Sequence, residues 1–425
     1  MKTIVRMLWL LCLSLGFSLQ VAYAQAEPDS TRQTTQGGIL VADPHPHPLF
    51  IPPPPLIDPG SVDASAVQAL TINVNYNPTQ MGRCDVPLVD WPSQARTALE
   101  YALRIWSSLL GGYQPLAVDA CWTNDPKGDR DAILLAQASS TESRKNFANA
   151  PVKETFYPVT LANQLSNSDL NGAAAEIRIE FNANQPWYLG TDGRVPAGQY
   201  DLVSVALHEV GHALGFQGSM KWDDGTGDAE CNGTMGVGCY NVPPFIYDRF
   251  VQNAHLQVLV DSFNNNSIEL GNQLINNTLR FGGPNAMATN GNVAPRLFIP
   301  GPWQPGSSYS HLDEETFNGT TNALMTPILG FQEAIHHPGE VALGILRDLG
   351  WQIRDNSVTF VNANNTSYED GSGLYPFNTA EEGVNAVSNG GTVIFAAGNY
   401  PGPVTIIRRM VLTSPDGTAV LGSRP

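Results

Sequence analysis

One five-residue string combines residue types that bind and use a metal ion: His208-Glu209-Val210-Gly211-His212. On a helix, the two histidines are four positions apart and share one face, so both imidazoles can bind the same Zn²⁺. Glu209 lies one position round the helix, where a carboxylate can hold a metal-bound water and take its proton. The spacing therefore predicts a zinc site that includes its own general base.

A catalytic zinc generally keeps three protein ligands and leaves one position for water, so a third ligand has to be found. The chain has eight histidines, which makes elimination practicable. His311, in the string Ser308-Tyr309-Ser310-His311, remains once the other five outside the motif are set aside. Those five lie in a proline-rich stretch, on an expected helix surface or as an adjacent pair: His45, His47, His255, His336 and His337.

Two further features favour a histidine as the third ligand. Gly215 follows His212 by three residues and lets the helix end and the chain turn away. In zinc enzymes whose third ligand is a glutamate, the helix continues past the second histidine and needs no such break. Downstream, residues 323–327 (ALMTP) predict a tight apolar turn around Met325. A carboxylate third ligand stays open as an alternative, with three candidates: Glu230, Glu333 and Glu340.

These features resemble the metzincin clan of zinc endopeptidases, which combine His-Glu-x-x-His-x-x-Gly with a later histidine and a methionine-containing turn. The chain departs from the usual pattern, because Gly218 stands where the third histidine normally follows. Leishmanolysin-like enzymes are most similar within the clan, since they insert a long segment after the glycine and take the third ligand from a distant Ser-His. The string YSHLDEETFNGTTNALMTP fits that arrangement, with His311 as ligand and Met325 in the turn beneath the site.

The resemblance covers about residues 70–351 and implies hydrolysis of peptide bonds in protein or peptide substrates. Zn²⁺ on His208, His212 and His311 would polarise the scissile carbonyl, and Glu209 would pass a proton from the attacking water to the leaving amine. The rival hypothesis is an extracellular surface protein that binds polysaccharide and keeps a vestigial metal site. The intact Glu209 counts against it, because a dead site is free to lose its base.

The first 24 residues have the pattern of an export signal. Lys2 and Arg6 precede an apolar run over residues 7–17 that is too short to span a bilayer, and residues 22–24 (AYA) fit signal cleavage. We expect secretion, or delivery to the periplasm or cell envelope, after cleavage near Ala24. No later run is apolar for long enough to predict a membrane span.

Cysteine usage agrees with export. Four cysteines remain once Cys12 leaves with the signal, and an even number in an oxidising compartment predicts two disulfides. Four cysteines allow three connectivities. Local spacing favours Cys231 with Cys239, closing a glycine-rich loop, and Cys84 with Cys121, tying two early segments.

The charge balance excludes some partners. Asp and Glu outnumber Lys and Arg by 39 to 22, and the formal net charge is −17. Nucleic acids and anionic membranes are bound by basic faces, so neither is an expected partner. Two acidic clusters, 125–131 and 223–230, are candidates for Ca²⁺, which prefers carboxylate and loop carbonyl oxygens, although solvated loops are the simpler interpretation.

The expected fold class is α+β, with a twisted mixed sheet, an active-site helix and a loop-rich lower subdomain. The signal peptide (1–24) precedes a proline-rich linker or pro-segment (25–60) that we expect to lie outside the fold, since proline disfavours helix and sheet. A metallopeptidase-like domain follows at 61–356, with a loop-rich insertion at 219–305. The C-terminal segment is 357–425.

Periodicity predicts the main elements of that domain. Helices are expected over 91–110, from Asp201 into the motif, and over 339–349, with strands at 71–76 and 116–122. Residues 176–181 alternate strictly between charged and apolar side chains, so we expect a strand near a sheet edge. A free edge there could pair with an extended peptide substrate.

The tail changes character to short β-rich runs separated by Gly, Asn and Pro. Its opening, from VNANNTSYEDGSG to GNYPGPVTI, resembles the start of right-handed parallel β-helix domains of the pectate-lyase-like type. The resemblance implies that a helix at about 379–387 caps the first coil. It also makes polysaccharide a candidate partner of this segment.

Overall fold

A computed structural model of the chain describes residues 32–33, 38–54, 56, 68–78, 84, 88–124, 134–226, 231–354, 358–366, 369, 371, 373, 376–387, 390–407 and 409–423. Its class is α+β, as the sequence predicts. A large hydrophobic core extends through the part of the chain up to Trp351, and a small separate core lies in the tail. The expected signal peptide lies outside the described residues.

A six-stranded mixed sheet forms the frame of the larger body, in the order β16-β2-β6-β9-β5-β3. Neighbours β3, β5 and β9 run parallel, β6 is antiparallel to both β9 and β2, and β16 is parallel to β2. The strands are β2 (Gly38–Ile51), β3 (Ile72–Tyr76), β5 (Leu116–Thr123), β6 (Leu134–Ser140), β9 (Ile177–Asn182) and β16 (Ile328–Ile335).

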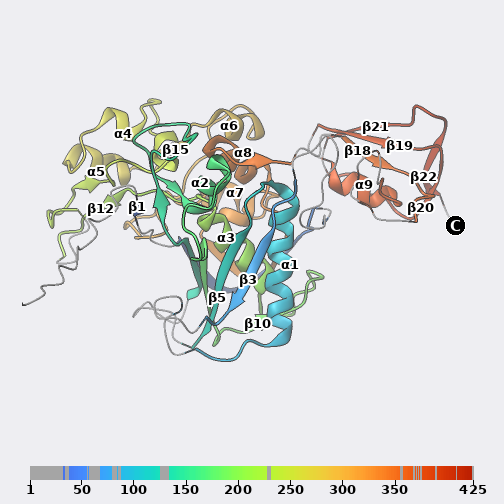
Figure 1. The fold of residues 1–425 in the computed structure, drawn as a ribbon, viewed down its shortest axis with the longest axis horizontal. Helices are drawn as coiled ribbons and strands as arrows, with labels where there is room; N and C mark the ends of the chain where they lie inside the picture. Colours follow the sequence, from blue (N-terminus) through green and yellow to red (C-terminus); the bar gives the residue numbers. More distant parts are fainter. Residues whose placement is uncertain are drawn as a thin grey trace, which may run out of the picture.

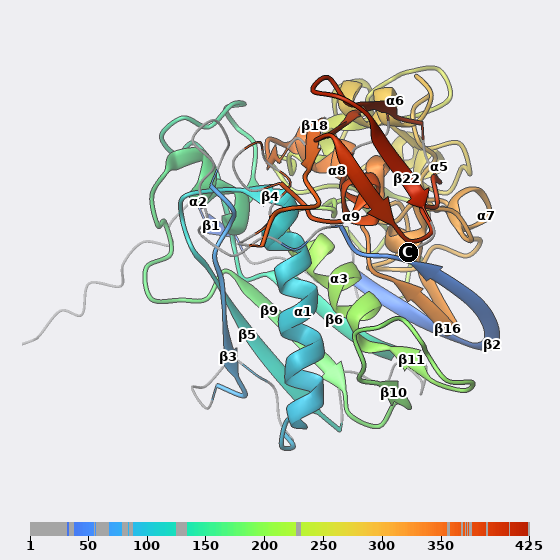
Figure 2. The same ribbon diagram turned by 90° about the vertical axis from the view of Figure 1, so that its right-hand side faces the viewer.

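Two long helices pack together against this sheet (Figure 2). Helix α1 (Ser93–Leu109) matches its prediction, and its apolar positions recur at helical spacing on one buried face. Helix α3 (Leu202–Ala213) carries the His-Glu motif and contacts β2, β6, β9 and β16. The predicted C-terminal helix is α8 (Glu340–Leu349). Packing against the sheet therefore fixes the position of α3.

The proline-rich segment does not lie outside the fold. Residues 38–51 form β2, an interior strand between β6 and β16. Its register with β6 covers only residues 38–41, whereas β16 pairs with it from Val41 to Ile51. After Val41, β2 therefore pairs with β16 on one side and with none of the described strands on the other. Prolines lack an N–H and are tolerated along such an edge, so Pro44, Pro46 and Pro48 are compatible with the strand.

The expected edge strand at 176–181 is also wrong in its position. The structure places it as β9, flanked by β6 and β5 in the interior of the sheet. Its alternating charged residues are satisfied there instead of facing water. Arg178 pairs with Glu180 along the strand, and Gln137 Nε2 on β6 donates to Glu180 Oε2 at 2.7 Å. Charged side chains that pair with each other inside the sheet therefore give the same alternating sequence pattern as a strand with one solvent-exposed face.

The insertion at 219–305 contains only short elements in its described part. They are β12 (Lys221–Trp222), β13 (Gly238–Cys239), a 3₁₀ turn η1 (Tyr247–Phe250), β14 (Val251–Gln252), α4 (Leu259–Ser262), α5 (Ile268–Leu274), β15 (Arg280–Phe281) and α6 (Pro284–Thr289). Both favoured disulfides are present, Cys84–Cys121 and Cys231–Cys239, with Cα atoms 5.7 Å and 5.6 Å apart.

Small elements complete the larger body. After the insertion come α7 (Glu314–Phe317) and the 3₁₀ turn η2 (Ala323–Met325), which precedes β16. The remaining short elements are β1 (Arg32–Gln33), β4 (Leu110–Gly111), β7 (Ser143–Arg144), β8 (Tyr157–Pro158), α2 (Val159–Ser166), β10 (Trp187–Tyr188), β11 (Tyr200–Asp201) and β17 (Gln352–Ile353).

The tail lies to one side of the larger body (Figure 1, orange to red). Strands β18 (Val358–Val361), β19 (Thr392–Phe395) and β21 (Val411–Thr413) stack in parallel, as do β20 (Gly398–Pro401) and β22 (Ala419–Ser423). Helix α9 (Ala380–Ala386) begins with a capping box between Thr379 and Glu382. The tail therefore consists of short parallel strands next to one short helix. None of the described helices is long and apolar enough to cross a bilayer.

Candidate metal centre

The motif helix is fixed at both ends. Asp201 caps its N-terminus, where its carboxylate accepts from Ser204 N at 2.8 Å. At the other end, Gly215 has φ +115°, a conformation that favours glycine, and the chain turns away there. Every residue of α3 is buried. The predicted helix start and stop are therefore both confirmed.

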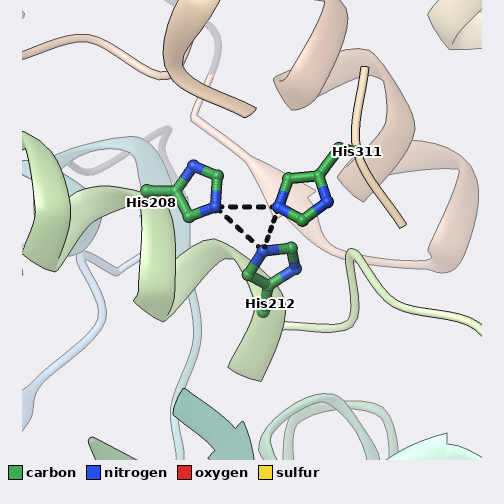
Figure 3. A group of neighbouring side chains, drawn as sticks. All are labelled: His208, His212 and His311. Atoms are coloured by element: carbon green, nitrogen blue, oxygen red, sulfur yellow. Dashed lines mark hydrogen bonds between the residues drawn. The ribbon is translucent and has the colours of Figure 1, made fainter. Parts of the chain in front are cut away.

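The three predicted histidines converge (Figure 3). His208 Nε2 lies 3.0 Å from His212 Nε2 and 3.1 Å from His311 Nε2, and His212 Nε2 lies 3.1 Å from His311 Nε2. Nitrogens that each lie about 2.0–2.1 Å from a tetrahedral zinc are about 3.3 Å apart. The observed triangle fits one such ion after a small outward movement of the rings. In the described ranges, this is the one group of three or more His, Cys, Asp or Glu residues that could hold an ion.

The opposite nitrogen of each ring contacts a main-chain carbonyl. His208 Nδ1 donates to Leu324 O at 2.6 Å, His212 Nδ1 to Phe216 O at 2.8 Å, and His311 Nδ1 to Ser307 O at 2.8 Å. A carbonyl can only accept, so the proton resides on Nδ1 and the Nε2 lone pair faces the centre of the triangle. This is the tautomer that a metal ligand needs.

Burial also keeps the rings neutral. It lowers the pKa of His208 and His311 well below the usual 6.5, with help from the neighbouring imidazoles, and lowers the pKa of His212 to about 4. Three uncharged imidazoles at neutral pH can bind a cation without first losing protons.

Glu209 is fully buried beside the triad. Its two carboxylate oxygens have no hydrogen-bond partner within the described part of the chain. Burial raises its pKa well above 4.5, and the main-chain amides of Leu40 and Ala138, which lie near the carboxylate without forming hydrogen bonds to it, offset only part of that rise. A buried carboxylate without a partner is costly. A cation and its bound water would satisfy it, so the donor set and this orphaned acid together fit a zinc site.

The turn with Met325 supports the motif helix from below. A Cβ added at Gly211 would lie 2.7 Å from Met325 Sδ, so the methionine packs directly against the helix at its glycine. Leu324 O accepts from His208 Nδ1, and Met325 O accepts from Leu312 N at 2.8 Å, next to His311. The turn therefore connects two of the three histidines without offering a ligand of its own.

Gly218, the departure from the usual motif, has a steric explanation. A Cβ at this position would collide with the Tyr309 hydroxyl and the Asp248 carboxylate. A histidine is thus excluded where the usual pattern has one, and the third ring arrives from further along the chain. Sequence reasoning did not identify Asp248, because nothing in its local spacing distinguishes it from a surface acid.

The other candidates are not part of this group. His45 and His47 are outside the triad and contact Asp43, while His336 is buried and pairs with Asp201 Oδ2 at 2.8 Å. Of the three alternative glutamates, Glu333 accepts from Gly330 N, Glu340 begins α8, and Glu230 lies outside the described residues.

The two acidic clusters offer no calcium site in the described part of the chain. All of residues 125–131 lie outside it, as do residues 227–230. Asp223 is buried, and its carboxylate accepts main-chain N–H groups from Gly225 at 2.9 Å and Gly233 at 2.7 Å. Its oxygens therefore organise their own loop.

Comparison with known proteins adds one finding. A family model described as SPBPB7E8-like matches residues 85–229. That stretch includes His208, Glu209 and His212 but ends before His311. No curated protein and no solved structure matches the chain.

Proposed function

We propose that this protein is a secreted zinc-dependent endopeptidase of the metzincin type, with an arrangement similar to the leishmanolysin-like group. One observation carries the proposal: His208, His212 and His311 bring their Nε2 atoms within 3.1 Å of one another. The third ring comes from the position that the resemblance predicts. The buried Glu209 beside them is the second part of the catalytic pattern.

Each residue has a defined task in peptide hydrolysis. Zinc bound by the three imidazoles would act as a Lewis acid on the scissile carbonyl and lower the pKa of water. Glu209 takes the proton of the attacking water and delivers it to the leaving amine, so one O–H and one C–N bond break while one C–O and one N–H bond form. Burial raises the pKa of Glu209, which makes its carboxylate a stronger proton acceptor than an exposed glutamate.

The carbonyl partners of the rings contribute by orientation. Leu324 O, Phe216 O and Ser307 O each hold an Nδ1–H, so the rings need little rearrangement on binding the metal. Met325 is fully buried and shapes the apolar base beneath the helix rather than binding the metal.

The experiment is a casein-cleavage assay on the secreted chain after signal removal. Cleavage should disappear with a zinc chelator and return on addition of Zn²⁺. The matched variant is Glu209→Ala, which should bind one zinc per chain and cleave at least about 100-fold more slowly. A zinc-loaded wild type that cleaves no peptide, or cleavage that survives in Glu209→Ala, would reject the proposal.

A further inference from the structure

His311 lies 99 positions after His212, so the fold must hold it against the motif helix by contacts outside the triad. Two segments meet near the site: residues 218–220, which leave the helix, and residues 307–311, which carry the ligand. Two residues of the second segment reach the first: Ser310 Oγ accepts from Gly218 N at 3.4 Å, and the closer contact is made by Tyr309. It is buried and has φ +53°, an uncommon conformation for a non-glycine residue.

The Tyr309 hydroxyl lies between the two segments. It accepts from Met220 N at 2.5 Å and donates to Asp248 Oδ1 at 3.1 Å. The Asp248 carboxylate in turn accepts from Ser219 N at 3.0 Å and from Ser219 Oγ at 2.5 Å, and Phe245 N donates to it at 3.0 Å. One carboxylate from the insertion thus connects the chain after the motif with the chain before His311.

The chemistry of Asp248 makes this connection specific. Burial raises its pKa to about 6, which still leaves the carboxyl ionised at neutral pH. Its partners are neutral donors, and an ionised carboxylate can accept from all of them at once. A fully buried charge is costly and is retained only with such a set of donors. Gly218 completes the arrangement, since a Cβ there would enter the space of both groups.

We propose that Asp248 and Tyr309 are positioning residues that hold His311 in place and thereby set the zinc affinity of the site. This rests on the zinc ligand set of the proposed function but does not depend on peptidase activity. The long insertion then has a structural role. In the usual motif a short chain after the glycine brings the third histidine to the metal, whereas here η1 supplies Asp248, which helps to hold the distant segment that carries His311.

The test compares Tyr309→Phe and Asp248→Asn with wild type in zinc affinity and in the visible spectrum of the Co²⁺-substituted protein. We expect zinc affinity to fall about 10- to 100-fold in each variant, as for other groups that orient metal ligands. The double variant should lose little more than the weaker-binding single variant, because the two residues act as one unit. The Co²⁺ bands should move toward those of His311→Ala, which lacks the ligand itself.

Tyr240→Phe is the matched control. It removes a hydroxyl from the same insertion, whose partner is Val260 O at 3.3 Å, and should leave zinc affinity unchanged. Thermal unfolding without metal reports on folding, and if Asp248→Asn fails to fold, the milder Tyr309→Phe decides.

Wild-type zinc affinity and an unchanged Co²⁺ spectrum in Tyr309→Phe would overturn the proposal, even if the variant melted at a lower temperature. Reduced affinity in both variants supports it, also when wild type cleaves no peptide, an outcome that would reject the proposed function alone. Wild-type affinity in His311→Ala would reject the ligand set and the positioning role together.

Discussion

The three imidazoles of the candidate centre are prepared for a cation by their surroundings. Burial disfavours their charged forms, and carbonyl acceptors at Nδ1 leave Nε2 unprotonated. Glu209 experiences the same burial with the opposite consequence, a raised pKa. The site therefore places neutral ligands next to a buried carboxyl group that has no hydrogen-bond partner among the described residues, a combination that favours a bound metal.

Zinc release should require stronger acid than an exposed histidine site would. The folded-state pKa of His212 is lowered from 6.5 to about 4, so the metal-binding form persists as pH falls through 6.5 and is lost as pH approaches that lower value. Equilibrium dialysis against a pH series should show retention down to about pH 5. A release midpoint near 6.5 in protein that is still folded by circular dichroism would contradict this.

Substitution of Met325 should affect stability and leave the metal in place. Its side chain is fully buried against α3, so Met325→Ala should lower the free energy of unfolding by about 2–5 kcal/mol, whereas Met325→Leu should cost less than about 1.5 kcal/mol. Both variants should bind one zinc per chain. Denaturant unfolding and zinc analysis check this, and loss of zinc from the folded Leu variant would show that the sulfur has a direct role.

Individual elements show which patterns in the sequence were informative. Helices α1, α3 and α8 follow from 3.6-residue periodicity and clear end signals, and the motif placed two ligands on α3 from local spacing alone. The interior position of β9 and the existence of β2 could not be predicted from the sequence patterns. The salt bridge between Arg178 and Glu180 concealed the burial of β9, and proline content concealed a strand that needs a partner on one side only.

The strand β2 should be essential to the fold. Leu40 is 1% exposed and belongs to the main core, so Leu40→Ala should lower the free energy of unfolding by about 2–5 kcal/mol. Leu256→Ala is the matched control at a residue that is 72% exposed, and it should change stability by less than about 0.5 kcal/mol. Equal stability of both variants in urea unfolding would show that residues 38–51 are a linker after all.

At the scale of the molecule, the two cores are distinct. The main core ends at Trp351, and the tail packs its own residues from Val361 to Tyr400. A cavity of about 370 Å³ is lined by Ile51 and His337 from the larger body and by Ile407 and Arg409 from the tail. The two bodies therefore do not pack closely at this cavity, and none of the three histidines lines it.

Truncation after Arg354 should therefore leave the metal centre intact. The shortened chain keeps β17, which pairs with β4, and should bind zinc with wild-type affinity because its core is unchanged. Zinc titration and thermal unfolding of both forms provide the measurement. Loss of zinc binding in a truncated chain that still unfolds cooperatively would show that the tail supports the site.

X-ray absorption at the zinc edge tests the central claim most directly, since it counts the ligands around the ion. The zinc-loaded protein should show three imidazole nitrogens and one oxygen ligand at about 2.0–2.1 Å, and His311→Ala should lose one imidazole. A spectrum with two imidazoles and a carboxylate, unchanged in His311→Ala, would contradict the convergence of His208, His212 and His311 on one metal.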